Sequence, residues 1–210
     1  MNIFYLSEDI EECAEFHIDK HVTKMILESA QLLCMALWSD KLFGYTPRAL
    51  TSEEYQELKL AMSKLPKTMD ERINDPIPYK AGHHNHPCSI WLRSSIEHFY
   101  YLHVLANELQ REAWYRGYNT HKSTGVINSL PLPNDLPNKG FVPPYPAMPE
   151  ELKSGDTLND YRLFYMLDKA AIPATWRGRD KPFWWDEDIA LYHKRYTGMT
   201  PSERKEIGFL

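Results

Sequence analysis

The chain lacks several features that would assign it to a class at once. No apolar run approaches the ~18 residues needed to cross a membrane, and the start of the sequence has no basic stretch followed by an apolar one, so we expect no signal peptide. The three cysteines, Cys13, Cys34 and Cys88, are odd in number and widely spaced. Such spacing excludes a disulfide framework and suggests a reducing compartment.

Strand signals are also nearly absent, and no internal repeat is visible. The net charge of −5 over 210 residues argues against nonspecific nucleic-acid binding through an overall positive field, although it permits a local basic surface. A hydrophobic content of 43% is typical of a folded globular protein with one good core. We therefore expect a single domain of the all-α class.

Helical periodicity and capping residues predict the elements. We expect an extended arm at 2–6 and helices at about 8–38, 51–62, 88–115, 156–171 and 186–196. Residues 123–153 hold seven of the fifteen prolines and are typical of an extended loop. The predicted fold is a compact helical domain around two long helices, with this proline-rich loop wrapping over them.

The most informative stretch runs from Phe16 to Leu33. Wound as a helix, it places five polar side chains inside an arc of about 80°, while the rest of its surface from residue 22 onward is largely apolar. We call these five residues the polar seam: His17, His21, Lys24, Glu28 and Gln31. A helix that is apolar almost all round is buried, so a narrow polar seam is expected to face a partner or a cleft.

Two interpretations of the polar seam stay open. Lys24 and Glu28 can form a structural i,i+4 pair within a satisfied network. Alternatively, two imidazoles, an ammonium, a carboxylate and an amide on one face supply the groups used in acid–base catalysis and anion binding. The five together favour a functional cleft.

A second cluster of imidazoles lies in the segment 82–88. Combined with the i,i+4 pair of the polar seam, it suggests a metal site made of His17, His21, His84 and His86. The chain has no HExxH motif and no CxxC pair, so we keep the metal site as an alternative and expect no cofactor. The other interpretation of His86 is a helix cap before Pro87.

Two basic runs could meet phosphates. One spans Arg116 to Lys122, and the other is the T-W-R-G-R-D-K-P-F-W-W run with Trp176, Arg177 and Arg179. A mixture of cations and rings suits stacking on bases and gripping phosphates. It also suits a solvated surface or a tail that seals a core.

Three short motifs carry a resemblance to a known family. These are D-K-H-x-x-K-x-x-x-E-x-x-Q-x-L at 19–33, N-H-P-x-x-x-W at 85–91 and R-G-Y at 116–118. The chain resembles a phage and bacterial branch similar to the endonuclease V type pyrimidine-dimer DNA glycosylases. The resemblance covers residues 1–122, and more faintly the T-W-x-x-x-x-K-P tail. It implies a glycosylase-like core at 1–122, followed by the proline-rich loop at 123–153 and C-terminal helices with the aromatic and basic tail at 154–210.

The resemblance also implies a mechanism. In the family, DNA is bent over the polar face, and the N-terminal amine attacks the sugar C1′ with help from a glutamate on the first helix. The family's histidine falls at His17, but Lys24 occupies the position of the glutamate, and the carboxylate Glu28 lies one turn further on. Asn2 replaces the small residue that follows the initiator methionine in active members. These departures leave the role of the amine open.

The leading hypothesis is therefore an enzyme that acts on pyrimidine nucleotides or bases in DNA, at the N-glycosidic bond. Glu28 would stabilise the sugar cation or activate the attacking group, His17 and His21 would move protons, and Lys24 would hold a phosphate or act as a nucleophile. The remaining residues predicted to bind substrate are Lys20, Gln31, Asn85, His86, Trp91, Tyr101, Arg116, Lys122, Trp176, Arg177 and Arg179.

Two alternatives remain beside it. One is a metal-dependent hydrolase that uses the histidine clusters, and the other is a non-catalytic phage accessory protein that binds a nucleotide or a host protein. The expected partner is DNA or a nucleotide and not a membrane. We expect a cytoplasmic location, in the host cytoplasm if a phage encodes the protein. The sequence leaves the oligomeric state open.

Overall fold

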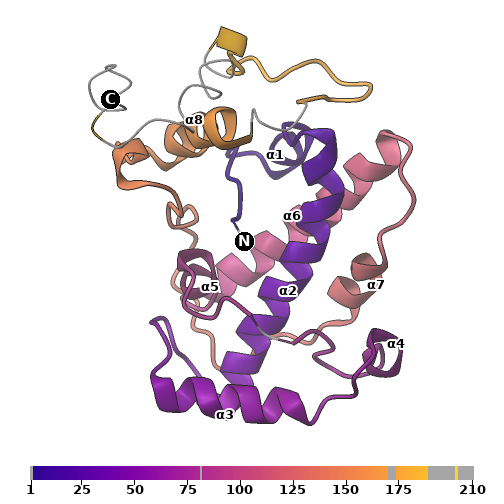
Figure 1. The fold of residues 1–210 in the computed structure, drawn as a ribbon, viewed down its shortest axis with the longest axis vertical. Coiled ribbons are helices and arrows are strands. Elements are labelled where there is room, and N and C mark those ends of the chain that lie inside the picture. Colours follow the sequence, from indigo (N-terminus) through magenta and orange to yellow (C-terminus); the bar gives the residue numbers. More distant parts are fainter. Residues whose placement is uncertain (1, 81, 170–173, 189–201, 203–210) are drawn as a thin grey trace.

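The computed structural model describes residues 2–80, 82–169, 174–188 and 202 (Figure 1). Within these ranges every regular element is helical and no strand occurs, which confirms the predicted all-α class. The elements are α1 (Ile10–Glu15), α2 (Asp19–Phe43), α3 (Ser52–Ser63), α4 (Met69–Arg72), α5 (Pro87–Leu92), α6 (Ile96–Tyr115), α7 (Lys122–Ser129), the 3₁₀ turn η1 (Glu150–Leu152) and α8 (Thr157–Lys169). None of the described helices combines the length and apolarity needed to cross a membrane.

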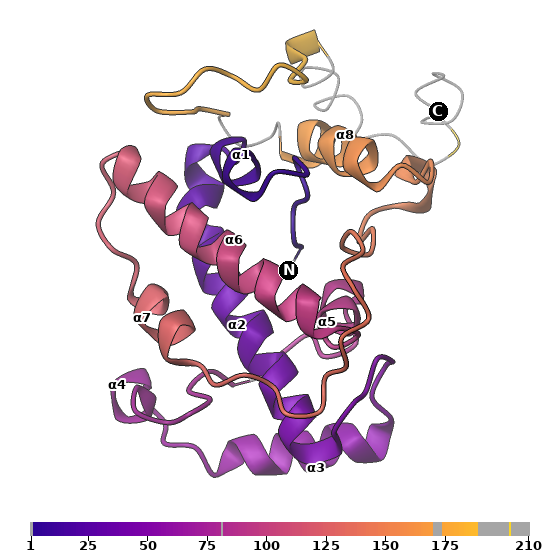
Figure 2. The same ribbon diagram turned by 180° about the vertical axis from the view of Figure 1, so that it is seen from behind.

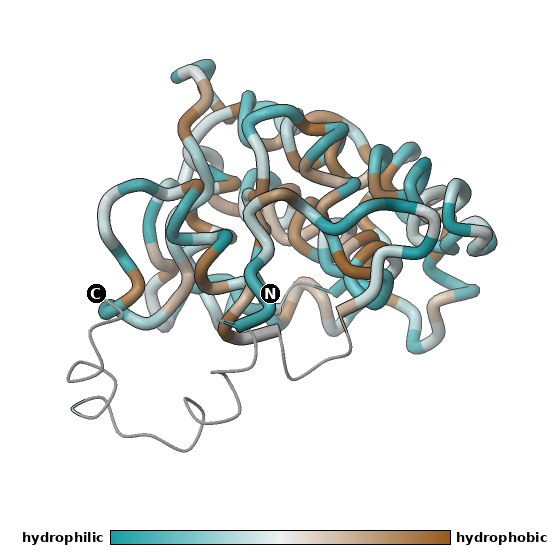
Figure 3. The backbone as a smooth tube through the Cα atoms, turned by 90° about the horizontal axis from the view of Figure 1, so that it is seen from above, coloured by the Kyte–Doolittle hydropathy of each residue, from teal (hydrophilic) through white to brown (hydrophobic). Residues whose placement is uncertain are grey.

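The two longest helices, α2 and α6, form the centre of the fold. They cross in both side views and share the most extensive contact between any two elements (Figures 1 and 2). The short helices α5 and α7 pack on both of them, while α1 packs on α6 and α3 lies across the C-terminal end of α2. Apolar and polar segments alternate along the backbone (Figure 3), as expected for amphipathic helices around one core.

The helix predicted at 8–38 is broken into α1 and α2. Asp9 caps α1 by accepting a hydrogen bond from the backbone N–H of Glu12 at 2.8 Å. At the break, the guanidinium of Arg116 donates to the carbonyls of Glu15 and His17, both at 2.8 Å. Because carbonyls at a helix end need partners, this distant arginine stabilises an interruption that local propensity does not show.

The helix predicted at 88–115 is likewise divided, into α5 and α6. His86 caps α5 through its Nδ1 atom, and Pro87 occupies the first turn, as predicted. Between the two helices, the buried guanidinium of Arg93 donates to three loop carbonyls, those of Thr46, Arg48 and His84. The short helix α4 lies between two of the predicted helices, and the predicted loop at 123–153 begins with most of α7. Most of the helix predicted at 186–196 lies outside the described residues.

The N-terminal arm at 2–6 threads into the interior of the protein. Ile3, Phe4, Tyr5 and Leu6 are all buried, with at most 5% of each residue exposed. The side-chain amide of Asn2 donates to the carbonyl of Ala147 at 3.1 Å. Figure 1 shows the arm running inward past α8 toward the middle of the molecule.

The proline-rich segment at 130–149 wraps around the helices from α7 to α8. Asp40, near the end of α2, accepts hydrogen bonds from the backbone of Asn134 and Asp135. Further along, the backbone of Val142 bonds to both Trp91 and His98. The segment is therefore held by its backbone at several points, although it has little helical structure of its own.

Candidate functional site

The polar seam does not form one continuous face, because His17 lies in the turn before α2. Its Nδ1 atom donates to the carbonyl of Cys13 at 2.7 Å, and only 1% of the residue is exposed. Burial lowers the pKa of His17 to about 4, and the charge of Arg116 acts in the same direction. This imidazole is therefore neutral at physiological pH and has no route to a substrate in this structure.

His21 is buried as deeply as His17. Its Nδ1 atom is 2.8 Å from the hydroxyl of Tyr165 on α8, which also accepts a hydrogen bond from the backbone N–H of Ile18 at 2.9 Å. The ring of Phe4 stacks on His21 with 5.2 Å between centroids. The two imidazoles of the polar seam thus join the N-terminal arm and α8 to the start of α2.

Lys24 and Glu28 form the open part of the polar seam. Lys24 Nζ lies 3.2 Å from Glu28 Oε1, and the two side chains are 54% and 15% exposed. This is the i,i+4 pair that the sequence allowed. Gln31, one turn further, is half-buried, and Lys20 is exposed on the first turn of α2.

Glu28 shares its surroundings with His86 and the end of the arm. Burial lowers the pKa of His86 to about 4; the positive charge of His83 adds to this, while the charge of Glu28 opposes it. Burial raises the pKa of the Cys88 thiol in the first turn of α5, and a hydrogen bond with the backbone of Ile3 opposes this. We call Lys24, Glu28 and His86, near which the arm ends, the arm-end site.

The other residues of the segment 83–86 have structural contacts. Asn85 exchanges two hydrogen bonds with the backbone of Leu50, and His84 stacks on Tyr55 with centroids 4.2 Å apart. Among the described residues, no group of three or more His, Cys, Asp or Glu side chains could hold a metal ion. The predicted set of His17, His21, His84 and His86 therefore does not form a metal site, because its members are divided between the core, a ring stack and a helix cap.

Trp91 and Tyr101, predicted to stack on a base, are both core residues. Trp91 is fully buried, stacks on His98 with centroids 4.3 Å apart and donates through Nε1 to the carbonyl of Val142. Tyr101 is 6% exposed and packs against Phe141 of the proline-rich segment. Neither ring presents a free face in this structure.

Arg116 is the centre of a buried ionic network. Its Nε donates to Glu112 Oε1 at 2.6 Å and its Nη1 to Asp19 Oδ1 at 2.9 Å, in addition to the two carbonyls at the α1–α2 break. The guanidinium is wholly buried, so all of these bonds are needed to offset its desolvation. The predicted role in substrate binding is replaced by a structural one, because every bond of this side chain is internal.

Residues 174–188, which we call the strap, cross over α1, the start of α2 and the end of α6 (Figure 1). Asp19 ties the strap down. Its backbone N–H donates to the carbonyl of Thr175, and its carboxylate accepts from the hydroxyl of Thr175 and the backbone of Arg177. Burial raises the pKa of Asp19, but these hydrogen bonds and Arg116 outweigh it, so the net pKa is lowered.

The predicted tail residues behave differently from one another on the strap. Trp176 is buried and donates through Nε1 to the carbonyl of Phe16 at 2.9 Å. Arg179 pairs with both Glu15 and Glu112, whereas the guanidinium of Arg177 lies over the ring of Tyr118, 5.0 Å from its centroid. Lys122 is exposed at the first position of α7.

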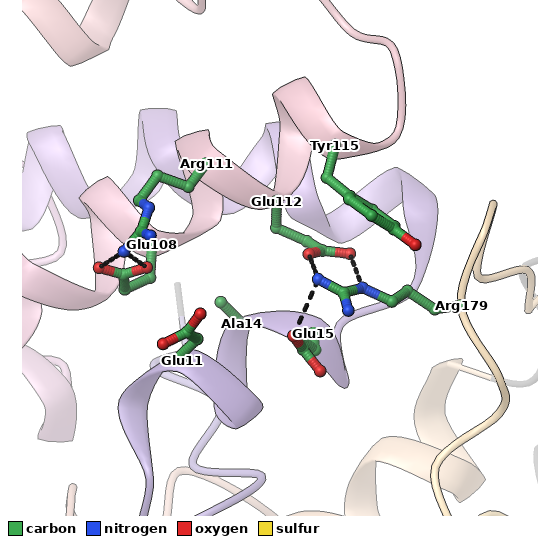
Figure 4. A pocket seen from close by; sticks show the side chains of 8 residues that line it. All are labelled: Glu11, Ala14, Glu15, Glu108, Arg111, Glu112, Tyr115 and Arg179. Atoms are coloured by element: carbon green, nitrogen blue, oxygen red, sulfur yellow. Dashed lines mark hydrogen bonds and ion pairs between the residues drawn. The ribbon is translucent and has the colours of Figure 1, made fainter.

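Two pockets of opposite character flank Arg179. The smaller one, of about 180 Å³, lies between α1 and α6 and is shown in Figure 4. Four glutamates line it with Arg111, Tyr115 and Arg179: Glu11, Glu15, Glu108 and Glu112. The larger one, of about 480 Å³, is lined by Asp19 and six strap residues, among them Arg177, Arg179 and Lys181. The first suits no phosphate, while the second, which we call the strap pocket, carries three cationic side chains and one carboxylate.

Several residues that organise the site were not predicted from the sequence. Phe4 and Tyr165 hold the imidazoles, and Asp19 and Glu112 hold the two arginines. Asp19 is the first residue of the D-K-H motif. Its position between His17 and His21 in the sequence was the signal that could have identified it. Glu112 lies four residues before Arg116, and this i,i+4 spacing was also an available signal. Phe4 and Tyr165 come from other segments of the chain, and nothing local marks them.

Comparisons with known proteins do not identify a relative: no family model, no curated protein and no solved structure matches the chain.

Proposed function

We propose that the protein is an enzyme that acts on pyrimidine nucleotides or on pyrimidine bases in DNA, at the N-glycosidic bond. The observation that carries this proposal is the position of Glu28. Its carboxylate is 15% exposed on the central helix α2, paired with Lys24 and close enough to His86 for its charge to act on that imidazole. A partly desolvated carboxylate beside a cation is suited to stabilise a developing sugar cation.

The reaction proposed at the arm-end site is hydrolysis. The oxygen of a water molecule bonds to C1′ of the sugar, the bond from C1′ to the base nitrogen breaks, and its electron pair and a proton go to the base. Glu28 accepts the proton of the water or stabilises the cationic sugar, and Lys24 holds a phosphate of the substrate. The resemblance of the D-K-H and N-H-P motifs to the pyrimidine-dimer glycosylases supports this choice of bond.

We propose a role for the two buried histidines that differs from the proton transfer predicted from the sequence. His17 and His21 cannot move protons to a substrate, since both are enclosed by Phe4, Tyr165 and the α1–α2 turn. We assign them as positioning residues instead. They fix the N-terminal arm against α2, and the arm in turn forms one side of the arm-end site.

The test is turnover by the Glu28→Gln variant. Purified protein is incubated with pyrimidine nucleotides and with oligonucleotides that contain uracil or a thymine dimer, and the released base or abasic site is measured. We expect Glu28→Gln to lower the rate at least 100-fold, with an unchanged circular dichroism spectrum. The control is Glu108→Gln, which removes a carboxylate from the surface pair with Arg111 on α6. Wild-type rates in Glu28→Gln would refute the assignment.

A non-catalytic nucleotide binder is the second candidate, and one contact favours it. The ammonium of Lys24 and the carboxylate of Glu28 already form an ion pair at 3.2 Å. Groups paired in this way can recognise a ligand without taking part in a reaction. The same substrate panel distinguishes the two functions. A binder would retain nucleotides in equilibrium dialysis and release no product.

A further inference from the structure

One aromatic ring on the strap is far more exposed than its neighbours. Phe183 is 79% exposed, whereas Trp176 on the same strap is 6% exposed and seals the core. Phe183 has the highest exposure of the large apolar side chains in the described part of the chain. Most of this ring therefore faces solvent, where it is available to a partner.

Two neighbouring side chains hold the ring in place. The guanidinium of Arg162 lies over Phe183, 5.2 Å from the ring centroid, and the ring of Phe16 meets it at 73° with 6.0 Å between centroids. Arg162 is itself fixed, because its Nε donates to the carbonyl of Leu6 at 2.9 Å. One face is thus backed by a cation, and the high exposure leaves the opposite face open for another flat group.

In the described part of the chain, positive charge without a carboxylate partner lies both on the strap, at Arg177, and on α8, at Arg162. Among the described residues, neither Arg162 nor Arg177 has a carboxylate within ion-pair distance, whereas Lys181 pairs with Glu187. Arg177 lines the strap pocket, which has a volume of about 480 Å³. The carboxylate of Asp19 in this pocket already accepts hydrogen bonds from Thr175, Arg116 and the backbone of Arg177, so it competes little for the open cation.

The strap thus carries an exposed aromatic ring at Phe183 and, six residues earlier, the guanidinium of Arg177, which lines a pocket. Arg177 lies over Tyr118 and donates through Nη1 to the carbonyl of Arg116 at 3.4 Å, but it has no carboxylate partner among the described residues. A ring and an unneutralised cation suit a single-stranded nucleic acid.

We propose that the strap binds single-stranded DNA, with an unpaired base stacked on Phe183 and a phosphate held by Arg177 in the strap pocket. This inference rests on the proposed function and specifies that the DNA substrate is held as a single strand. Any base can stack on a ring face, so we expect the binding to be independent of sequence. Because the net charge of the chain is −5, we expect the binding to be confined to this surface.

The experiment measures the affinity of the full chain for a fluorescein-labelled 12-nucleotide single strand by anisotropy at several salt concentrations. We expect Phe183→Ala to weaken binding roughly 5- to 100-fold and Phe183→Trp to retain it. Arg177→Gln should weaken binding and reduce the slope of log affinity against log salt by about 0.7, the value for one phosphate contact on a single strand.

Matched controls come from the rest of the surface. Tyr100→Ala removes another exposed aromatic ring, 45% exposed on α6, and Lys59→Gln removes an exposed cation on α3. Both should bind like the wild type. If Phe183→Ala binds as tightly as Tyr100→Ala, or if the wild type binds no oligonucleotide, the inference is overturned.

Glu28→Gln separates this inference from the proposed function. If Phe183→Ala and Arg177→Gln weaken binding, Glu28→Gln binds the strand normally and the wild type cleaves no pyrimidine substrate, the strap assignment is correct and the proposed reaction is wrong. If turnover of free nucleotides depends on Glu28 while no strap variant changes DNA binding, the reaction stands and the strap assignment fails.

Discussion

The two ends of the polar seam both carry ionisable side chains but have opposite surroundings. At one end His17 and His21 are 1% exposed and bonded to the core, and at the other Lys24 and Glu28 form an ion pair that reaches solvent. The difference comes from what covers each end. Phe4 and Tyr165 cover the imidazoles, while no large ring stacks on the ion pair among the described contacts. A polar stripe on a buried helix can therefore be part scaffold and part site.

The largest effect should come from breaking the ionic network that supports the sealed end. Arg116→Leu leaves the buried Glu112 without one of its two arginines and the carbonyls of Glu15 and His17 without a donor. We expect a loss of about 3–5 kcal/mol in the free energy of unfolding, measured by urea denaturation. Arg111→Leu, which removes a surface pair on the same helix, is the control and should leave the midpoint unchanged. Equal midpoints for both variants would show that the network contributes nothing.

A smaller effect should appear when the pH is lowered. The pKa of His17 is about 4 in the folded protein and about 6.5 in an unfolded chain. As the pH falls below 6.5 the unfolded chain therefore binds the proton first, and stability decreases until the pH reaches about 4. The full contribution is about 3 kcal/mol.

The variant His17→Asn isolates this contribution, since its amide can still donate to the carbonyl of Cys13. The stability lost between pH 7 and pH 4.5 should be about 2–3 kcal/mol smaller in His17→Asn than in the wild type, as followed by urea denaturation at both pH values. His103→Asn, at a half-buried position on α6, is the matched control. An unchanged pH dependence in His17→Asn would mean that His17 is not the residue responsible.

The smallest effect on stability should come from the open end. Lys24→Met and Glu28→Gln each break an ion pair whose lysine is 54% exposed, so the free energy of unfolding should change by about 0.5 kcal/mol or less. For comparison, Tyr165→Phe removes one hydroxyl at the sealed end and should cost about 1–2 kcal/mol. If Glu28→Gln is the more destabilising of the two, Glu28 belongs to the scaffold and the comparison between the ends collapses.

The helix caps are the part of the fold with the clearest local signals in the sequence. Thr51 caps α3 with Glu54 in a capping box, His86 and Pro87 begin α5, and Gly117, with φ of 79°, follows the end of α6. These signals are local, because each joins groups within a few residues. The all-α class follows from them together with the helical periodicity.

The breaks in the two long predicted helices were not predictable, because their causes are not local. Arg116 reaches the carbonyls of the α1–α2 turn from 99 and 101 residues away, and Arg93 reaches loop carbonyls 45 and 47 residues away. The same holds for the polar seam. A helical wheel gives the angle at which His21 leaves α2, but not that Phe4 and Tyr165 close over it.

The bond between the backbone N–H of Asp19 and the carbonyl of Thr175 has a consequence for dynamics. If the strap detaches from the helices, the Asp19 amide loses its hydrogen-bond acceptor and the indole of Trp176 becomes exposed at the same time. The hydrogen-exchange rate of the Asp19 amide therefore reports how often the strap detaches, and a slow rate would mean that it opens only together with the start of α2.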